Sequence, residues 1–76
     1  MRVYKGTKED KRAFVKEVLF DLLVMTNSGW YGAEYEDIPN KGEYIYLLDK
    51  DGVRCQKIDV TADSITAIIQ DVFKKI

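Results

Sequence analysis

The 76-residue chain contains no histidine, one cysteine (Cys55) and one proline. Without histidine, it lacks the commonest metal ligand and the commonest general base. A single cysteine leaves no intrachain disulfide, which fits a reducing compartment and predicts a cytoplasmic location. No nucleophile motif or glycine-rich phosphate loop is present. We therefore expect a protein that is not an enzyme and that binds no metal and no cofactor.

Long apolar runs are also missing. The run over residues 18–25 is interrupted by Asp21 and is far shorter than the roughly 20 residues that a membrane span requires, so we expect no membrane partner. Hydrophobic residues make up 46% of the chain and charged residues 33%. This composition is typical of a globular protein, and the length predicts one small domain over residues 1–76.

The net charge is only −1, but the charges are unevenly distributed along the chain. Residues 1–16 carry a net charge of +4, and residues 17–51 carry −6. A basic start could track nucleic-acid phosphates, although mixed charges are also ordinary on a solvated helix face. The residues of this nucleic-acid hypothesis are Lys5, Lys8, Lys11, Arg12 and Lys16.

Two helices are predicted by apolar periodicity and by capping residues. Thr7 and Asp10 have the character of a capping box, and a helix over residues 8–26 follows. Asn27, Ser28 and Gly29 supply its end, with Gly29 suited to the left-handed conformation. The second helix is predicted over residues 62–75, with Thr61 as its N-cap and Asp63 in its first turn.

The first predicted helix is apolar over more of its circumference than one packing surface requires. Its predicted core stripe runs from Phe14 to Met25, and further apolar side chains lie on the opposite side. These side chains predict that something covers a second face of the helix. A homodimer or larger self-assembly through this face is one hypothesis, with Phe20, Leu23 and Val24 as its contact residues.

Three strands are predicted between the helices. Residues 43–48 and 53–60 form a hairpin around Asp49-Lys50-Asp51-Gly52, a pattern suited to a type I turn with a left-handed glycine. Residues 30–36 alternate as a half-buried strand. Residues 1–5 are left open between a short strand and a frayed start. The predicted fold is therefore α+β, with the order helix, three-stranded antiparallel meander, helix (αβββα) in two layers.

The hairpin has apolar residues on both of its faces. By alternation, Ile45, Leu47, Val53 and Cys55 share one face, and Tyr44, Tyr46, Leu48 and Ile58 lie on the other with Arg54. Cys55 is therefore predicted to be a buried structural thiol. If both helices cover one face, the tyrosine-rich face stays open. The alternatives are that the helices sandwich the sheet or that the tyrosines only stabilise it.

Aromatic and acidic residues gather in the segment Asn27–Gly42 and in the strand that follows it. We interpret Tyr31, Ala33 and Tyr35 as structural. Because tyrosine and tryptophan are enriched at binding hot spots, the leading hypothesis is a protein-binding module. Its predicted contact residues are Trp30, Glu34, Glu36, Asp37, Tyr44 and Tyr46, and its predicted partner has a basic and apolar surface.

In its small size, its lack of motifs and its aromatic and acidic character, the chain resembles accessory or inhibitor proteins encoded by phages and mobile elements, including anti-CRISPR proteins. The resemblance rests on no diagnostic motif and assigns no functional residue. It implies that the partner is a host protein.

Overall fold

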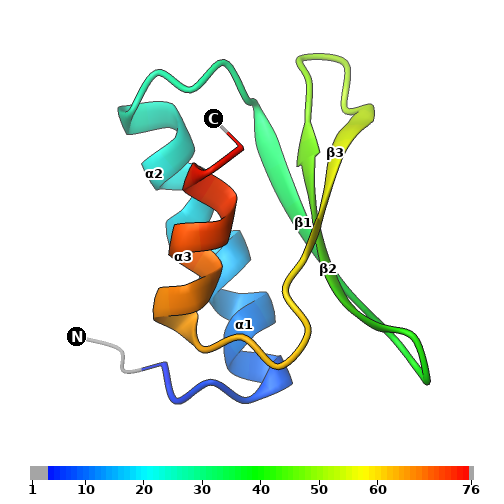
Figure 1. Cartoon of the computed structure of the whole chain (residues 1–76). Helices are drawn as coiled ribbons and strands as arrows, with labels where there is room; N and C mark the ends of the chain where they lie inside the picture. The colour runs from blue at the N-terminus through cyan, green and yellow to red at the C-terminus, as the bar shows by residue number, and fades with distance from the viewer. Residues whose placement is uncertain (1–3, 76) are drawn as a thin grey trace.

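Helices lie on one side of the molecule and a three-stranded sheet lies on the other (Figure 1). The computed structural model describes residues 4–75. Its elements, in chain order, are α1 (Lys8–Phe14), a π-helical turn η1 (Val15–Leu19), α2 (Phe20–Met25), β1 (Gly32–Ile38), β2 (Gly42–Leu48), β3 (Arg54–Asp59) and α3 (Ile65–Phe73). The first three elements run on as one helix, so the predicted αβββα order is confirmed. Tyr4 and Lys5 belong to neither a helix nor a strand, and residues 1–3 of the stretch left open lie outside the described residues.

Both helices begin at a side-chain cap. The hydroxyl of Thr7 accepts a backbone N–H three residues further on, as predicted, and the hydroxyl of Ser64 does the same for α3. The helix predicted over residues 62–75 is present, but its start and its predicted cap at Thr61 were wrong, because α3 begins only after Ser64. The hydroxyl of Thr61 is used in a tertiary contact instead, where it accepts the backbone N–H of Glu43 at 3.0 Å.

Replacing Ser64 by Ala is expected to lower the free energy of unfolding by about 1 kcal/mol, because an orphan N–H at the start of α3 loses its acceptor. In a domain of this size the melting temperature should fall by about 4–8 °C. Thr66→Ala removes an exposed hydroxyl inside the same helix and is the matched control. Thermal unfolding followed by circular dichroism measures both variants, and an equal effect of the two would contradict the assigned cap.

The first helix ends in a Schellman motif. Asn27 takes the left-handed conformation (φ 53°), and its N–H donates to the carbonyl of Val24 at 3.2 Å. The N–H of Ser28 donates to the carbonyl of Leu23 at 3.3 Å. The helix therefore ends within the predicted stop Asn27–Gly29, but the left-handed residue that closes it is Asn27, and Gly29, also left-handed, lies two residues further on.

The π-helical turn changes which residues of the first helix face the core. The buried residues Lys11, Val15, Leu19 and Leu23 recur at intervals of four, whereas an α-helix repeats every 3.6 residues. The wider turn at η1 accommodates this longer spacing. Leu23, predicted to be a surface contact, is consequently fully buried, while Met25, predicted to be in the core stripe, is 79% exposed.

The sheet is antiparallel, with β2 between β1 and β3. Tyr35 on β1 lies opposite Ile45 on β2, and Ile45 lies opposite Ile58 on β3. The turn between β2 and β3 has the predicted form: Gly52 is left-handed (φ 80°) and its N–H donates to the carbonyl of Asp49 at 3.0 Å. The register of the hairpin therefore places Ile58 on the same face as Ile45.

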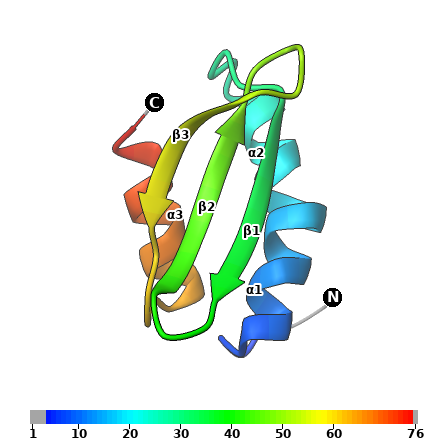
Figure 2. The same ribbon diagram turned by 90° about the vertical axis from the view of Figure 1, so that its right-hand side faces the viewer.

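Both helices cover the same face of the sheet (Figure 2). The core lies in the single layer between the helices and the sheet, and no helix of the described residues covers the opposite face. This arrangement confirms the two-layer prediction and rules out the sandwich alternative for the described residues. The buried core residues are Phe14, Val15, Leu19, Leu23, Ile45, Leu47, Ile58, Val60, Ile68 and Val72.

The prediction for the faces of the hairpin was right for β2 and wrong for β3. Ile45 and Leu47 are buried, but so is Ile58, which was assigned to the tyrosine face. Cys55 is exposed rather than buried. The register slips by one residue beside Leu47 and Leu48, so Cys55 is an extra, unpaired residue of a bulge. Alternation alone cannot locate such a slip.

Candidate functional site

The face of the sheet that the helices leave uncovered is organised in three columns, one from each strand. Opposite residues in an antiparallel pair share a face, so Glu34 lies beside Tyr46 and Tyr46 lies beside Lys57. β1 thus contributes carboxylates, β2 contributes tyrosines, and β3 contributes mainly cations. We call this surface the open face, and its side chains are Glu34, Glu36, Tyr44, Tyr46, Leu48, Arg54, Lys57 and Asp59.

Arg54 joins the three columns. Its Nε lies 3.0 Å from Oε1 of Glu34, its Nη1 lies 3.4 Å from Oε2 of Glu36, and its guanidinium carbon lies 4.2 Å from the ring centroid of Tyr46. The ammonium of Lys57 lies 4.3 Å from the ring centroid of Tyr44. Each tyrosine ring therefore has a cation over it, and the rings are held in fixed positions on a rigid sheet.

The structure brings together four of the six predicted partner contacts, Glu34, Glu36, Tyr44 and Tyr46. Trp30 is half-buried against the hydrophobic core, and Asp37 faces the helices, where it pairs with Lys8 at 3.0 Å. The core contact is sufficient to explain the large apolar side chain of Trp30.

The interpretation of the residues around Trp30 is partly corrected. Ala33 and Tyr35 pack against the core, as expected of structural residues. The same prediction for Tyr31 was wrong, because this residue is 63% exposed. Trp30 is thus more buried than predicted and Tyr31 is less buried, because β1 begins at Gly32 and neither residue follows the alternation of the strand.

The predicted basic surface is divided by the fold. Lys11 is buried and pairs with Glu43, and Lys8 pairs with Asp37. Lys5, Arg12 and Lys16 are exposed, and none of them makes an ion pair with another described residue. The burial of Lys11 removes one of the five residues of the nucleic-acid hypothesis from the surface, and its salt bridge explains why a lysine lies on the core side of the helix.

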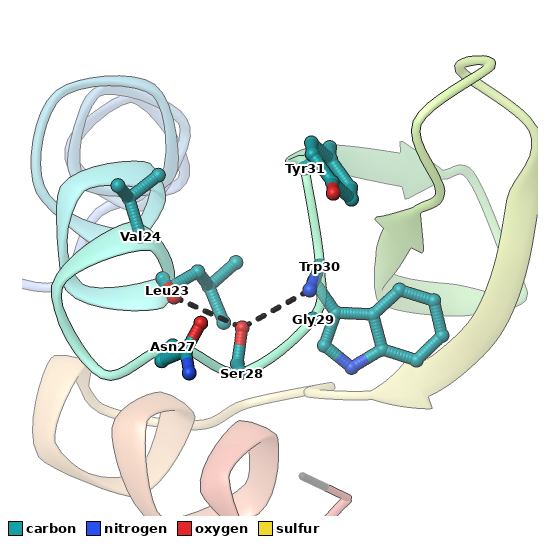
Figure 3. A pocket seen from close by; sticks show the side chains of 7 residues that line it. All are labelled: Leu23, Val24, Asn27, Ser28, Gly29, Trp30 and Tyr31. Atoms are coloured by element: carbon teal, nitrogen blue, oxygen red, sulfur yellow. Dashed lines mark hydrogen bonds between the residues drawn. The ribbon is translucent and has the colours of Figure 1, made fainter.

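Of the residues predicted to mediate self-association, Phe20 and Val24 are exposed and Leu23 is part of the core. Val24 and Tyr31 line a cavity of about 230 Å³ at the end of the first helix (Figure 3). The hydroxyl of Ser28 forms part of its wall, donating to the carbonyl of Leu23 and accepting the N–H of Trp30. These hydrogen bonds pair the polar groups of the turn. The exposed apolar side chains of Val24 and Tyr31 surround the opening of the cavity.

A buried polar network missed by the sequence predictions ties the first helix to the sheet. Oε1 of Glu43 accepts hydrogen bonds from Nζ of Lys11 (2.9 Å) and from the hydroxyl of Tyr35 (2.5 Å), and Oε2 accepts the N–H of Ala62 (2.9 Å). The side chains of Lys11 and Glu43 are only 5% and 7% exposed. A sequence signal did exist, because Lys11 lies on the same four-residue spacing as the buried residues Val15 and Leu19.

The environment of Glu43 keeps its carboxylate charged. Burial by itself raises the pKa of Glu43, but hydrogen bonds from Tyr35, Ala62 and Lys11 outweigh it and bring the pKa down to about 2. Burial and the bond to this carboxylate raise the pKa of the Tyr35 hydroxyl well above its ordinary value. At neutral pH Glu43 therefore stays charged and the Tyr35 hydroxyl stays protonated, as expected of groups that hold the helix and the sheet together.

A second carboxylate is held in an unfavourable state. Oδ2 of Asp63 is buried and has no hydrogen-bond partner among the described residues. Burial raises the pKa of Asp63, and the neighbouring carboxyl of Asp71 raises it further, to about 6. Asp59 adds to this effect and Lys11 opposes it. Keeping Asp63 ionised at neutral pH therefore costs folding free energy.

The exposed Cys55 has no feature that activates a thiol. Desolvation by neighbouring atoms and a hydrogen bond to the carboxylate of Asp49 raise the pKa of Cys55, so the thiol stays protonated at neutral pH. Within residues 4–75, no group of three or more cysteine and carboxylate side chains is placed to hold a metal ion. No helix in that range is both long and apolar enough to cross a membrane.

Comparisons with known proteins give no functional lead: no family model matches the chain, and neither a curated protein nor a solved structure is significantly similar to it.

Proposed function

We propose that this protein is a non-enzymatic protein-binding module and that the open face is its binding surface. The observation that carries the proposal is the placement of both helices on one side of the sheet, which leaves Tyr44 and Tyr46 without a covering layer. Tyrosine and arginine are the residues that most often supply binding energy at protein interfaces, and the open face presents both on regular strands.

The side chains of the open face indicate the charge and polarity of the partner's surface. The open face carries three carboxylates against two cations, which suits a partner with basic side chains, and the two tyrosine rings, each already beside a cation, suit apolar groups. A host protein as the partner, and a role as an inhibitor or accessory protein of a phage or mobile element, are the parts of the proposal that the resemblance in size and composition implies. A cytoplasmic location belongs to the same proposal, because a lone cysteine fits a reducing compartment.

Loss of the two tyrosines tests the proposal. The double variant Tyr44→Thr/Tyr46→Thr keeps good strand formers on β2, and we expect its affinity for the captured partner to fall at least about 30-fold, since hot-spot truncation costs 2 kcal/mol or more. The control is Thr66→Ser/Gln70→Ser, two exposed positions on α3. The measurement is capture from a lysate of the source cells with tagged protein, followed by titration of the purified partner.

Three results would contradict the proposal. One is equal binding by the tyrosine variant and the control. Another is capture that nuclease treatment abolishes, which would support the nucleic-acid alternative through Arg12 and Lys16. The third is recovery of the protein itself alone, which would support self-assembly through Phe20 and Val24.

A further inference from the structure

The outer edge of β1 is an unpaired strand edge. The sheet order is β1-β2-β3, so β2 lies on one side of β1 and no described strand lies on the other. Such an edge presents backbone N–H and C=O groups to which another extended chain can add. An added chain there would lie beside the carboxylates of the open face.

The hydrogen bonds of the sheet show which residues of β1 point outward. The carbonyl of Glu43 accepts the N–H of Val60 at 2.9 Å, so the backbone groups of Glu43 point to β3. By alternation, those of Tyr44 point to β1, where Tyr44 lies opposite Glu36. The remaining residues of β1 therefore direct their N–H and C=O groups away from the sheet, and these are Ala33, Tyr35 and Asp37.

One stripe of the first helix runs beside this edge. Arg12 and Lys16 line a cavity of about 320 Å³ together with Ala33 and Tyr35 of β1. Neither cation makes an ion pair with another described residue. The stripe keeps a spacing of four residues, so after Lys16 it continues with Phe20 and Val24. Both of these apolar side chains are exposed. A chain added to β1 would therefore have basic groups and then apolar groups on its helix side.

A second copy of this protein is a poor occupant when the two β1 strands pair about Tyr35, the register that covers the whole strand. Antiparallel pairing of two β1 strands about Tyr35 would place Glu34 of one copy opposite Glu36 of the other, twice. Like charges directly opposite each other destabilise a strand pair. Acidic residues at this edge thus act against self-pairing in this register and favour a chain that carries basic residues at those positions.

We propose that the β1 edge binds an extended segment of the partner protein as a fourth, antiparallel strand. The segment alternates: basic side chains lie beside Glu34 and Glu36, acidic side chains face Arg12 and Lys16, and an apolar residue reaches the cavity at Val24 and Tyr31. This inference rests on the proposed protein-binding function, and it specifies how the partner is held and what its sequence looks like.

The probe is a capped seven-residue peptide, Thr-Lys-Glu-Lys-Glu-Thr-Leu, whose first residue is placed opposite Asp37 and whose last is placed opposite Tyr31. Its matched control exchanges every Lys with a Glu and so keeps composition and net charge. Titration into the isotopically labelled protein, followed by nuclear magnetic resonance, is expected to shift the amides of Ala33 and Tyr35 and to slow their exchange with solvent. The control peptide should bind at least tenfold more weakly.

Backbone methylation of the probe tests strand pairing without altering the protein. The N–H of the third peptide residue, opposite Tyr35, faces β1, and the N–H of the fourth, opposite Glu34, faces away. N-methylation at the third residue is therefore expected to lower the affinity at least tenfold, whereas N-methylation at the fourth should leave it within about threefold. The variant Lys16→Glu should also weaken binding of the probe at least tenfold.

The outcomes separate this inference from the proposed function. If both methylated peptides bind alike and the shifts map to Tyr44, Tyr46 and Lys57, strand addition is wrong and binding at the open face stands. If the probe shifts no amide at millimolar concentration, strand addition is also wrong, and the tyrosine double variant decides the proposed function on its own.

Discussion

Glu43→Gln is expected to lower the free energy of unfolding by about 3–5 kcal/mol, because it removes the carboxylate that pairs directly with the buried ammonium of Lys11. A domain of 76 residues has a total stability of about 4–11 kcal/mol, so most of the stability would be lost. Urea unfolding at pH 7 measures the effect. The matched control is Glu36→Gln on the open face, where a solvent-exposed pair with Arg54 contributes at most about 1 kcal/mol.

The loss should be reversible by a second substitution. In Lys11→Met/Glu43→Gln the buried charge is absent, and the new amide can still accept the N–H of Ala62, so we expect at least half of the lost stability to return. If Glu43→Gln costs no more than Glu36→Gln, or if the double variant is no more stable than Glu43→Gln, the buried pair does not hold the helix to the sheet as described.

The same carboxylate predicts acid sensitivity. The pKa of Glu43 is about 2 in the folded protein and 4.5 ordinarily, so the folded state favours the charged form. Its contribution is fully present above about pH 4.5 and is lost as the pH falls toward 2. Wild-type stability should therefore fall steeply in this window, and Glu43→Gln should flatten that part of the profile.

Asp63→Asn is expected to stabilise the protein by about 2 kcal/mol at pH 7 and above, because an amide removes the charge that burial and Asp71 disfavour. One pKa unit corresponds to about 1.4 kcal/mol, and partial exposure of the side chain reduces the full effect. The melting temperature should rise by about 8–16 °C. Asp51→Asn, an exposed carboxylate in the hairpin turn, is the control and should change little.

The pH dependence of this gain has the opposite sign to that of Glu43. The pKa of Asp63 is about 6 when folded and 3.8 ordinarily, so folding favours its protonated form. The penalty on the wild type is fully present above about pH 6 and disappears as the pH falls below 3.8. The advantage of Asp63→Asn should therefore vanish near pH 4, and a constant gain from pH 4 to pH 8 would contradict the proposed cause.

Much of the fold could be predicted because local signals agree with it. The turn Asp49–Gly52 forms as its residue types require, and Thr7 caps the first helix as its position suggests. The first helix ends within the predicted stop Asn27–Gly29. These features depend on short-range chemistry, which the sequence displays directly.

The errors arise where a tertiary contact outweighs a local preference. Thr61 has the residue type of an N-cap, but its hydroxyl serves Glu43 on a distant strand, so Ser64 takes the cap. Cys55 alternates like a core residue, but a one-residue slip in the hairpin turns it outward. Neither the competing partner nor the slip leaves a mark in the local sequence.

Only some of the residues of the open face could be predicted from the sequence. Alternation placed Tyr44 and Tyr46 together, and it grouped Glu34 with Glu36. Which face of the sheet the helices cover depends on how their apolar stripes pack against it. The π-helical turn changes the apolar stripe of the first helix, so this packing could not be inferred from the sequence. Lys57 became part of the surface only through the register between β2 and β3, so its place over Tyr44 could not be inferred in advance.

The most direct test of the binding surface is a photo-cross-linking amino acid at position 46, introduced into the protein in its source cells. Position 70, exposed on α3 and away from the sheet, is the control. A partner on the open face predicts one discrete cross-linked protein from position 46 and none from position 70. Cross-linking from position 70 alone, or from neither position, would contradict the assignment of the open face as the binding surface.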